Sequence, residues 1–383
     1  MKIVIAPDSF KGSISAEALC DAIETGIKAV CPDAIIHKLP LSDGGEGLVS
    51  SLIQSCGGTY RHAMVHDPLG REIKARYGLM DDGQTAVIEM AEASGLTLLQ
   101  PEERNPMRAD SYGTGQLIQH ALNLGCRRFV IGLGGSATVD GGMGMLRALG
   151  MRWLDAQGNE LEQTGGQALL ELQHYDRSRL DERLRQSSFV IASDVTNPLC
   201  GPNGAAAIFG PQKGADAEQV SVLDEALARY AQCVEAQEGI RVSTLSGAGA
   251  AGGMGAAFAA FLGAKLASGI DYVMEATRLS EAMASADLVI TGEGKLDQQT
   301  LSGKVIAGVC QLGQRHQTPV VALCGSVSLS LQEMKRIGLV AGFSIVPGPC
   351  SLEEAMKQAP EWAAERTMHM MRIMQCFANG SCR

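Results

Sequence analysis

Short apolar runs recur along the chain and predict strands of a parallel sheet. Most of them show little polar alternation, which is typical of strands covered on both faces. Helical patterns separate the runs. After Ser13, for example, apolar residues at Leu19, Ile23 and Ile27 share one helix face, and Pro32 follows the expected end. Alternating strands and helices predict a doubly wound α/β fold. The runs are KIVIA, AIIHKLPL, TAVIEM, RRFVIGL, SSFVIA, DLVIT, PVVAL and FSIV.

Residues 59–90 differ, because polar and apolar residues alternate there and the turn sequences DPLG and DDG interrupt them. This pattern predicts antiparallel hairpins. We therefore expect two domains with the active site in the cleft between them. Residues 1–60 and 286–383 would form a discontinuous Rossmann-like α/β domain. Residues 61–285 would form an inserted, mixed α/β domain that carries a Gly-rich phosphate loop.

The segment 247–264 has eighteen residues without a charge, which is the nominal length of a membrane span. Most of them are Gly or Ala, and Lys265 follows directly. We interpret the segment as a tightly packed internal helix and expect no membrane partner.

Composition narrows the function classes. The 383 residues carry a net charge of −10 and only 4% aromatic side chains, which argues against a nucleic-acid partner. The eleven cysteines include no C-x-x-C pair, so we expect reduced thiols rather than disulfides or a zinc site. The first residues do not form a signal peptide. We expect a cytoplasmic monomer or homodimer.

The stretch FVIGLGGSATVDGGMG, residues 129–144, runs from a buried strand into a Gly-rich loop, a type that often presents backbone N–H groups to phosphate. It is not a P-loop, which requires G-x-x-x-x-G-K followed by Ser or Thr. Gly132, Gly134 and Ala137 do give a weak dinucleotide pattern, with Asp155 about one βα unit later. However, the D-G-G sequence at 140–142 interrupts the helix which that pattern needs. A tight turn for close packing is the alternative.

Five predicted strands end in acidic or Gly-rich turns. The carboxyl ends of parallel strands share one edge of a sheet, so these turns can converge. A single Asp at such a place is more often a helix cap, but the whole set favours a site. The turns are APDSFKGS with Asp8 and Lys11, PLSDGGEG with Asp43 and Glu46, GGSATVDGG with Ser136 and Asp140, ASDVTNPLCG with Asp194 and Asn197, and TGEGKLDQQT with Glu293 and Asp297.

Carboxylates beside phosphate repel it unless a divalent cation lies between them, and Mg²⁺ uses one or two carboxylates together with phosphate oxygens. A further carboxylate can accept the proton of an attacking hydroxyl. Lys side chains and amides neutralise the transferred phosphoryl group. This inventory favours phosphoryl transfer over hydride transfer, which does not need the carboxylates.

Several strings together resemble the bacterial class I glycerate kinase family, from residue 3 to about residue 325. They are APDSFKGSISA, PLSDGGEG, VHDPLGR, SYGTGQLI, GLGGSATVDGGMGMLRALG, SDVTNPLCGPNGAAAIFGPQKGA, GAGAAGG and DLVITGEGKLDQQTLSGK. The resemblance implies an enzyme that moves the γ-phosphate of ATP, with Mg²⁺, to a hydroxyl of D-glycerate. It favours 2-phosphoglycerate over 3-phosphoglycerate as the product, in the breakdown of sugar acids or glyoxylate-derived carbon. The alternatives are an NAD-dependent oxidoreductase of small hydroxy acids and a non-catalytic sugar-acid sensor.

On the matching motifs we assign candidate roles from residue chemistry. Asp194 is the candidate general base, and Lys11 and Asp297 are further catalytic candidates. The candidates for binding nucleotide or phosphate are Gly134, Gly135, Ser136, Lys213 and Asp140. The candidates for binding the acceptor substrate are Asp8, Asn197, Arg71 and Thr114. The candidate metal ligands are Asp43, Asp297 and Glu293.

Overall fold

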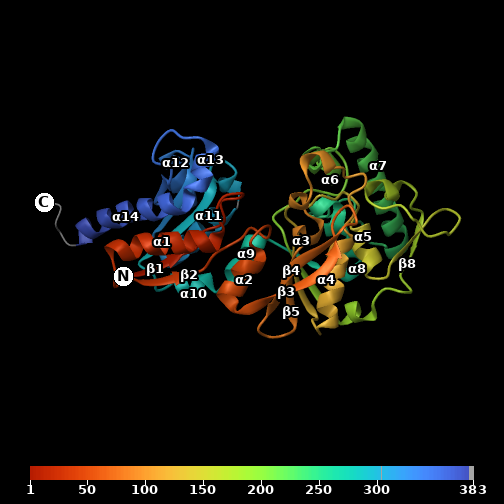
Figure 1. The fold of residues 1–383 in the computed structure, drawn as a ribbon, viewed down its shortest axis with the longest axis horizontal. Coiled ribbons are helices and arrows are strands. Elements are labelled where there is room, and N and C mark those ends of the chain that lie inside the picture. Colours follow the sequence, from red (N-terminus) through yellow and green to blue (C-terminus); the bar gives the residue numbers. More distant parts are fainter. Residues whose placement is uncertain (303, 379–383) are drawn as a thin grey trace. The chain divides into compact units, whose positions relative to one another are not determined.

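The computed structural model describes residues 1–302 and 304–378, and the chain forms two compact units (Figure 1). Unit 1 comprises Met1–Asp43, Ser50–Cys56 and Ile270–Arg383, and unit 2 comprises Gly44–Val49 and Gly57–Gly269. The domain boundaries expected from the sequence stay a prediction, because compactness alone does not show that either unit folds independently.

Unit 1 contains a five-stranded sheet in which every neighbouring pair is parallel. The order is β13-β12-β11-β1-β2. Numbered along this unit alone, that is the 2-1-3-4-5 order of doubly wound, flavodoxin-like sheets, with a switch point between the first and third strands. The expected doubly wound parallel sheet is confirmed. The strands are β1 (Lys2–Ile5), β2 (Ile35–Lys38), β11 (Leu288–Leu296), β12 (Val320–Val327) and β13 (Ala341–Ser344).

Helix α1 (Ala16–Val30) shows how the sequence builds unit 1. The Ser15 side chain accepts a hydrogen bond from the Ala18 amide and caps the helix, whose apolar face is buried. Helix α1 packs along α14 (Ala359–Ala378) (Figure 1). At their contact a Cβ added to Gly26 would lie 2.4 Å from the carbonyl oxygen of Ala364, so glycine permits the close approach. The other helices that lie wholly or mostly in unit 1 are α2 (Leu48–Cys56), α9 (Gly269–Ala276), α10 (Leu279–Met283), η7 (Thr300–Ser302), α11 (Val305–His316), α12 (Leu331–Ile337) and α13 (Leu352–Lys357).

Unit 2 contains a mixed sheet of order β10-β9-β6-β5-β4-β3. The first four strands are parallel, and β5, β4 and β3 pair antiparallel, which confirms the hairpins expected over residues 59–90. The strands are β3 (Gly58–His66), β4 (Glu72–Met80), β5 (Thr85–Glu89), β6 (Arg128–Gly132), β9 (Ser188–Ala192) and β10 (Lys265–Ala267). A separate antiparallel pair joins β7 (Arg152–Leu154) and β8 (His174–Asp176).

The helices of unit 2 surround one continuous apolar core, in which Trp153 and Phe258 are fully buried. Helix α8 lies in the uncharged segment 247–264 and is almost entirely buried, so the expected internal helix is confirmed. Across residues 1–302 and 304–378, no helix has both the length and the apolar character that a membrane span needs. The helices are α3 (Ala91–Ser94), η1 (Leu96–Leu98), η2 (Pro101–Glu103), α4 (Tyr112–Asn123), α5 (Met143–Ala148), η3 (Gly166–Leu170), η4 (Glu182–Gln186), α6 (Ala205–Phe209), η5 (Pro211–Lys213), α7 (Ala217–Glu238), η6 (Ala250–Gly253) and α8 (Met254–Leu262).

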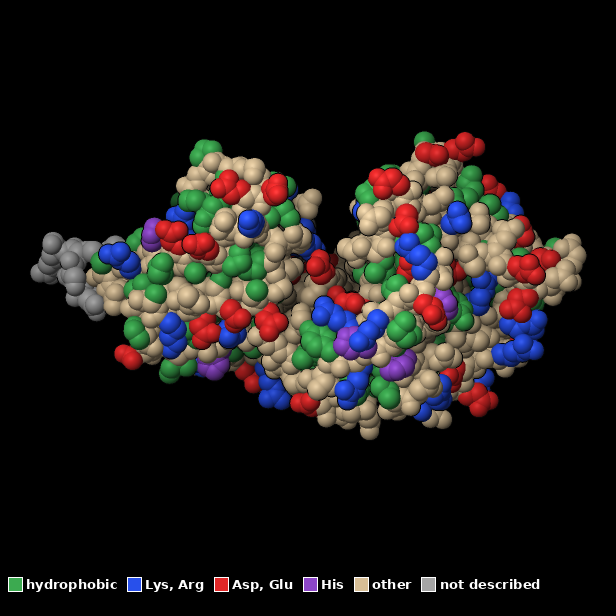
Figure 2. Space-filling view, viewed as in Figure 1, with side chains coloured by type: hydrophobic (Ala, Val, Ile, Leu, Met, Phe, Trp, Pro, Cys, Tyr) green, Lys and Arg blue, Asp and Glu red, His purple; other side chains and the backbone are tan. Residues whose placement is uncertain are grey.

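Side chains of both charges are interspersed over the surface of each unit on the face shown in Figure 2. Apolar side chains lie between them without forming one large continuous area on that face. The surface seen there therefore does not by itself mark a site, and the candidates must be found from the residues at the ends of the strands.

Candidate active site

A pocket of about 1000 Å³ opens in unit 1 at the carboxyl ends of the strands. It is lined by residues after β1 and β2 and by residues in or after β11, β12 and β13, including Asp8, Asp43 and, within β11, Glu293. Strands β1 and β11 are the neighbours at which the strand order switches direction. Doubly wound sheets bind their ligands at this point, because the loops on its two sides diverge and leave a crevice. Of the five turns predicted to converge, those with Asp8, Asp43 and Glu293 do so within this unit, whereas the turns after β6 and β9 belong to unit 2.

Asp8 is the most strongly perturbed acid in the pocket. Only 5% of the residue is exposed. Burial, and next the negative charge of Asp43, raise the pKa of Asp8 to about 7, although the Lys11 ammonium partly opposes this. The Lys11 Nζ lies 2.7 Å from the Asp43 Oδ2. Asp8, Lys11 and Asp43 thus form one electrostatic group.

Glu293 and Asp297 come from β11 and the turn after it, and both line the same pocket. Burial raises the pKa of Glu293, and the negative charge of Asp297 adds to the shift. The Thr300 hydroxyl donates a hydrogen bond to the Glu293 carboxylate, while the Asp297 Oδ1 accepts one from the Gln299 amide at 2.8 Å. Thr300 was not among the residues singled out from the sequence, although its place three residues after Asp297 is a usable signal.

The acids of this pocket would supply only part of the ligand shell of a magnesium ion. Within residues 1–302 and 304–378, no three His, Cys, Asp or Glu side chains are grouped so that they could hold a metal ion by themselves. Mg²⁺ commonly takes only one or two protein carboxylates and completes its shell with water and substrate phosphates. The surroundings of Asp8 support the fit of this pocket to Mg²⁺, because its buried carboxyl lies beside other carboxylates that a divalent cation would neutralise.

In unit 2 the Gly-rich loop follows β6 at the carboxyl edge of the sheet. Gly134 lies against the backbone of a second Gly-rich turn, where an added Cβ would be 2.6 Å from the Gly45 Cα. Gly135 has φ +74°, which few residues other than glycine adopt. In the described part of the chain, the amides of Gly134 and Gly135 donate no hydrogen bond to another group. Two successive amides without protein acceptors form a donor pair that suits an anion.

A buried lysine lies beneath this loop. The Lys213 Nζ donates hydrogen bonds to the Ser136 Oγ at 2.7 Å and to the Thr138 carbonyl oxygen at 2.8 Å. Burial lowers the pKa of Lys213 to about 7, and the negative charge of Asp140 opposes the shift. An anion bound at the loop would favour the charged form of this lysine.

Asp140 is fully buried and anchors the same loop. Its Oδ2 accepts hydrogen bonds from the Ser111 amide and hydroxyl at 3.0 and 2.6 Å and from the Gly144 amide at 3.2 Å. Its Oδ1 accepts one from the Gly142 amide at 3.0 Å. The carboxylate is therefore occupied by the protein and is a charge partner of Lys213. Ser111, which fixes it, lies in the string SYGTGQLI but was not among the candidate residues.

Asp194 and Asn197 follow β9, at the same edge of the unit 2 sheet as the Gly-rich loop after β6. Asp194 is exposed, and its Oδ1 accepts a hydrogen bond from the Gly269 amide at 2.9 Å. The Asn197 Nδ2 donates to the Asn203 carbonyl oxygen at 2.9 Å. Both positions agree with the expectation that these turns gather at the carboxyl edge.

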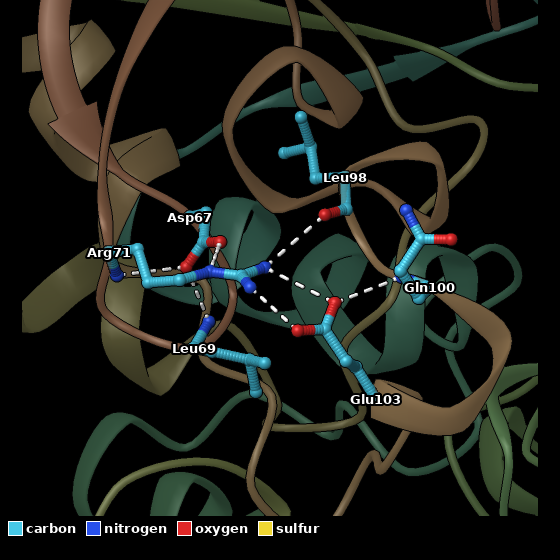
Figure 3. Close-up of polar contacts among 6 residues, drawn as sticks. All are labelled: Asp67, Leu69, Arg71, Leu98, Gln100 and Glu103. Carbon is cyan, nitrogen blue, oxygen red and sulfur yellow. Dashed lines mark hydrogen bonds and ion pairs between the residues drawn. The ribbon is translucent and has the colours of Figure 1, made fainter.

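The structure gives Thr114 and Arg71 protein partners. The Thr114 hydroxyl is buried in α4 and pairs with the Ser94 hydroxyl at 2.8 Å. The Arg71 guanidinium lies between two carboxylates, with Nε 2.5 Å from the Asp67 Oδ2 and Nη1 2.7 Å from the Glu103 Oε1 (Figure 3). A substrate carboxylate at Arg71 would have to compete with both.

Comparisons with known proteins match nearly the whole chain to glycerate kinases. The model of the glycerate kinase family matches residues 3–375. The glycerate kinase of Bacillus subtilis is 48% identical over 367 residues, which is 96% of each chain. The glycerate 2-kinase of Escherichia coli K12 is 47% identical over 359 residues, or 94% of each. A crystal structure of a Salmonella typhimurium LT2 protein assigned as a glycerate kinase 2 superimposes with a TM-score of 0.88 at 47% identity, covering 99% of each chain.

Proposed function

Because the chain belongs to the glycerate kinase family, we propose that it transfers the γ-phosphate of ATP to the C2 hydroxyl of D-glycerate. Family kinases move phosphate to an alcohol group, and the E. coli relative is a glycerate 2-kinase. The observation that carries the proposal is the loop above Lys213. The Lys213 ammonium group is buried and hydrogen-bonded to the Ser136 hydroxyl, beside the Gly134 and Gly135 amides, which donate to no acceptor in the described part of the chain; this arrangement suits a phosphoryl group.

In this proposal Ser136 and the amides of Gly134 and Gly135 hold phosphoryl oxygens. Lys213 supplies positive charge from below, and Asp140 holds the loop in shape. Phosphoryl transfer needs mainly positioning and electrostatic stabilisation, and a rigid loop with a buried cation provides both.

Asp194 is the proposed general base, and it would accept the proton of the glycerate hydroxyl as that oxygen attacks phosphorus. Asn197, from the same turn, would orient the acceptor. Lys11 would neutralise developing negative charge, and Asp8 would accept a hydrogen bond from a substrate hydroxyl. Thr114 and Arg71, proposed from the sequence as substrate contacts, would act through the backbone that they hold, since their polar groups already have protein partners.

One or two of the carboxylates of Asp43, Glu293 and Asp297 would hold Mg²⁺, directly or through water. When bound, the ion supplies charge neutralisation to phosphate oxygens, which several carboxylates would otherwise repel. The raised pKa of Glu293 beside Asp297 agrees with this assignment, since neighbouring carboxylates make a cation favourable.

No structural observation favours the nicotinamide alternative. Asp155, which that interpretation needs on a ribose, closes its own turn, where its Oδ1 accepts hydrogen bonds from the Gln157 and Asn159 amides at 2.8 Å each. The exposed carboxylate of Asp194 and the cation at Lys213 support a catalyst rather than a sensor. Ten cysteines in the described part of the chain are free, which agrees with a cytoplasmic, reducing environment.

The test is release of ADP from Mg-ATP with D-glycerate, with L-glycerate and without an acceptor, followed by phosphorus NMR of the product. We expect release only with D-glycerate. Coupling of phosphorus to a single proton would identify the secondary ester at C2, and coupling to two protons would move the transfer to C3. No release from folded protein would overturn the proposal.

A further inference from the structure

We propose that the pocket of unit 1 binds the nucleoside of the nucleotide, with its base against an apolar wall formed by Val346, Pro349, Leu352 and Met356. This assignment rests on the proposed kinase function, and it deepens that function by naming the place of the base and sugar. None of the roles proposed above uses the residues of this wall, because those roles concern only the polar residues of the same pocket.

The residues that line the pocket fall into two chemical sets. The charged set consists of the acids already described together with three lysines, Lys11, Lys295 and Lys304. The apolar set consists of Phe10, Val327, Ile345, Val346, Pro349, Leu352, Ala355, Met356 and Ala359. A ligand that uses both sets must join a charged part to a flat or apolar part, as a nucleotide does.

The wall is held in place by its own contacts. The Ser13 hydroxyl donates a hydrogen bond to the Met356 carbonyl oxygen at 2.8 Å, which ties α13 to the loop after β1. The Ser351 side chain accepts a hydrogen bond from the Glu354 amide and caps α13 at its start. Leu352, the first residue of that helix, is nevertheless 75% exposed and lines the pocket. An ordered apolar surface that faces a cavity gains stability when an apolar ligand covers it.

The pocket is also lined by backbone without side chains. Gly294 of β11 and Gly325 of β12 both line it. A Cβ added at Gly325 would lie 2.7 Å from the Gly294 carbonyl oxygen, so the two strands need glycine there. Bare peptide planes let a flat ring approach closely, and their N–H and C=O groups can match the polar edge of a base.

The volume of the pocket and the polarity of glycerate argue against this acceptor as the ligand that covers the apolar wall. At about 1000 Å³ the pocket lies at the upper end of the range for drug-sized ligands, roughly 300–1,000 Å³. Glycerate is a three-carbon acid with oxygen on every carbon, so an apolar wall would contribute little to its binding. A nucleoside triphosphate offers a broad ring to the wall and a polyphosphate to the lysines.

The first test places a charge on the wall. Leu352→Glu should weaken the binding of Mg-ADP, measured by titration calorimetry, and raise the KM for ATP by at least about 10-fold, which corresponds to about 1.4 kcal/mol. The KM for D-glycerate should stay within about twofold. The matched control is Leu331→Glu on α12, where an exposed leucine (59%) lies outside the pocket lining and its replacement should change neither constant.

The second test uses a thiol in the pocket as a reporter. Cys350 is exposed and lines the pocket, whereas Cys376 is exposed on α14 and does not. Mg-ADP and adenosine should each slow alkylation of Cys350 by iodoacetamide and leave Cys376 unchanged, as followed by peptide mass spectrometry. D-Glycerate should protect neither thiol.

The two proposals fail in different ways. Wild-type protein that binds ADP and protects Cys350, but phosphorylates no acceptor, would overturn the kinase proposal and support the nucleoside pocket. Active wild-type protein would overturn the pocket assignment in either of two cases. In the first, Leu352→Glu leaves the affinity for ADP unchanged. In the second, D-glycerate rather than adenosine protects Cys350.

Discussion

Replacing Lys213 with Met should remove a pH dependence from the stability of unit 2. The pKa of this lysine falls from an ordinary 10.5 to about 7 because the ammonium group is buried. Between these two pH values the unfolded chain carries the proton and the folded chain does not. The free energy of unfolding therefore rises with pH in this window, by about 1.4 kcal/mol per pH unit.

The size of the effect follows from the same two values. A fall from 10.5 to about 7, at about 1.36 kcal/mol per pKa unit, corresponds to about 5 kcal/mol. This cost is present in full below pH 7, where both states hold the proton, and it decreases as the pH rises toward 10.5. The Met side chain fills similar space without a charge, so Lys213→Met removes both the cost and its pH dependence.

The assay is urea unfolding followed by the fluorescence of Trp153, which is fully buried in unit 2, in a Trp362→Phe background so that only one tryptophan reports. Between pH 7.5 and 9.5 the free energy of unfolding with Lys213 should gain about 3 kcal/mol relative to the Lys213→Met variant. Lys74→Met, at an exposed lysine of β4, is the matched control and should leave the slope unchanged. Parallel pH curves for the protein that keeps Lys213 and for the Lys213→Met variant would refute the reasoning.

Four further changes test the site. Asp194→Asn should lower turnover with D-glycerate by at least ~10²-fold while the unfolding temperature stays unchanged, and near-normal turnover would remove Asp194 from the role of base. Asp8 should be ionised in the working enzyme, so kcat/KM should fall as the pH drops through about 7. Asp8→Asn should abolish this fall on the acidic side of the pH profile. A fall that survives in the variant would show that another group titrates. Arg71→Gln should lower the unfolding temperature, because it leaves a buried carboxylate unpaired, and should change the KM for D-glycerate less than about twofold; a large rise in KM with intact stability would show a substrate contact instead. Gly134→Ala should destabilise unit 2 by about 1–3 kcal/mol, because the added methyl would meet Gly45 at 2.6 Å, and a stable variant would mean that the two turns can separate at little cost.

Local patterns predicted the elements of the fold but not their order. The apolar runs around β1 and β11 predict strands because several consecutive residues are apolar. Their pairing, Ile3 beside Leu288, joins opposite ends of the chain and leaves no local trace. The 2-1-3-4-5 order therefore required the three-dimensional structure, whereas the doubly wound class did not.

The same distinction separates the candidate residues. Asp8 and Glu293 were found because each follows an apolar run of strand length, although β11 extends to Leu296, so that Glu293 lies within the strand. The surroundings of Asp140 and Thr114 depend on Ser111 and Ser94, which lie 29 and 20 residues away in sequence. An Asp after a Gly-rich loop has the same local sequence whether it faces a ligand or the protein interior, so the sequence could not distinguish these cases.

The placement of β1 between β2 and β11 has a consequence for synthesis on the ribosome. Apart from the short segment Gly44–Val49, unit 2 is one continuous stretch that is complete once Gly269 has been made. Unit 1 begins first and finishes last, since β1 keeps an unpaired edge until residues 288–296 emerge. Domains tend to fold as units as they are synthesised, so unit 2 should fold while the first strands of unit 1 are still incomplete. A nascent chain arrested after Gly269 has left the ribosome, but before residues 288–296 have emerged, would therefore present a protease-resistant unit 2 and an N-terminal segment open to cleavage.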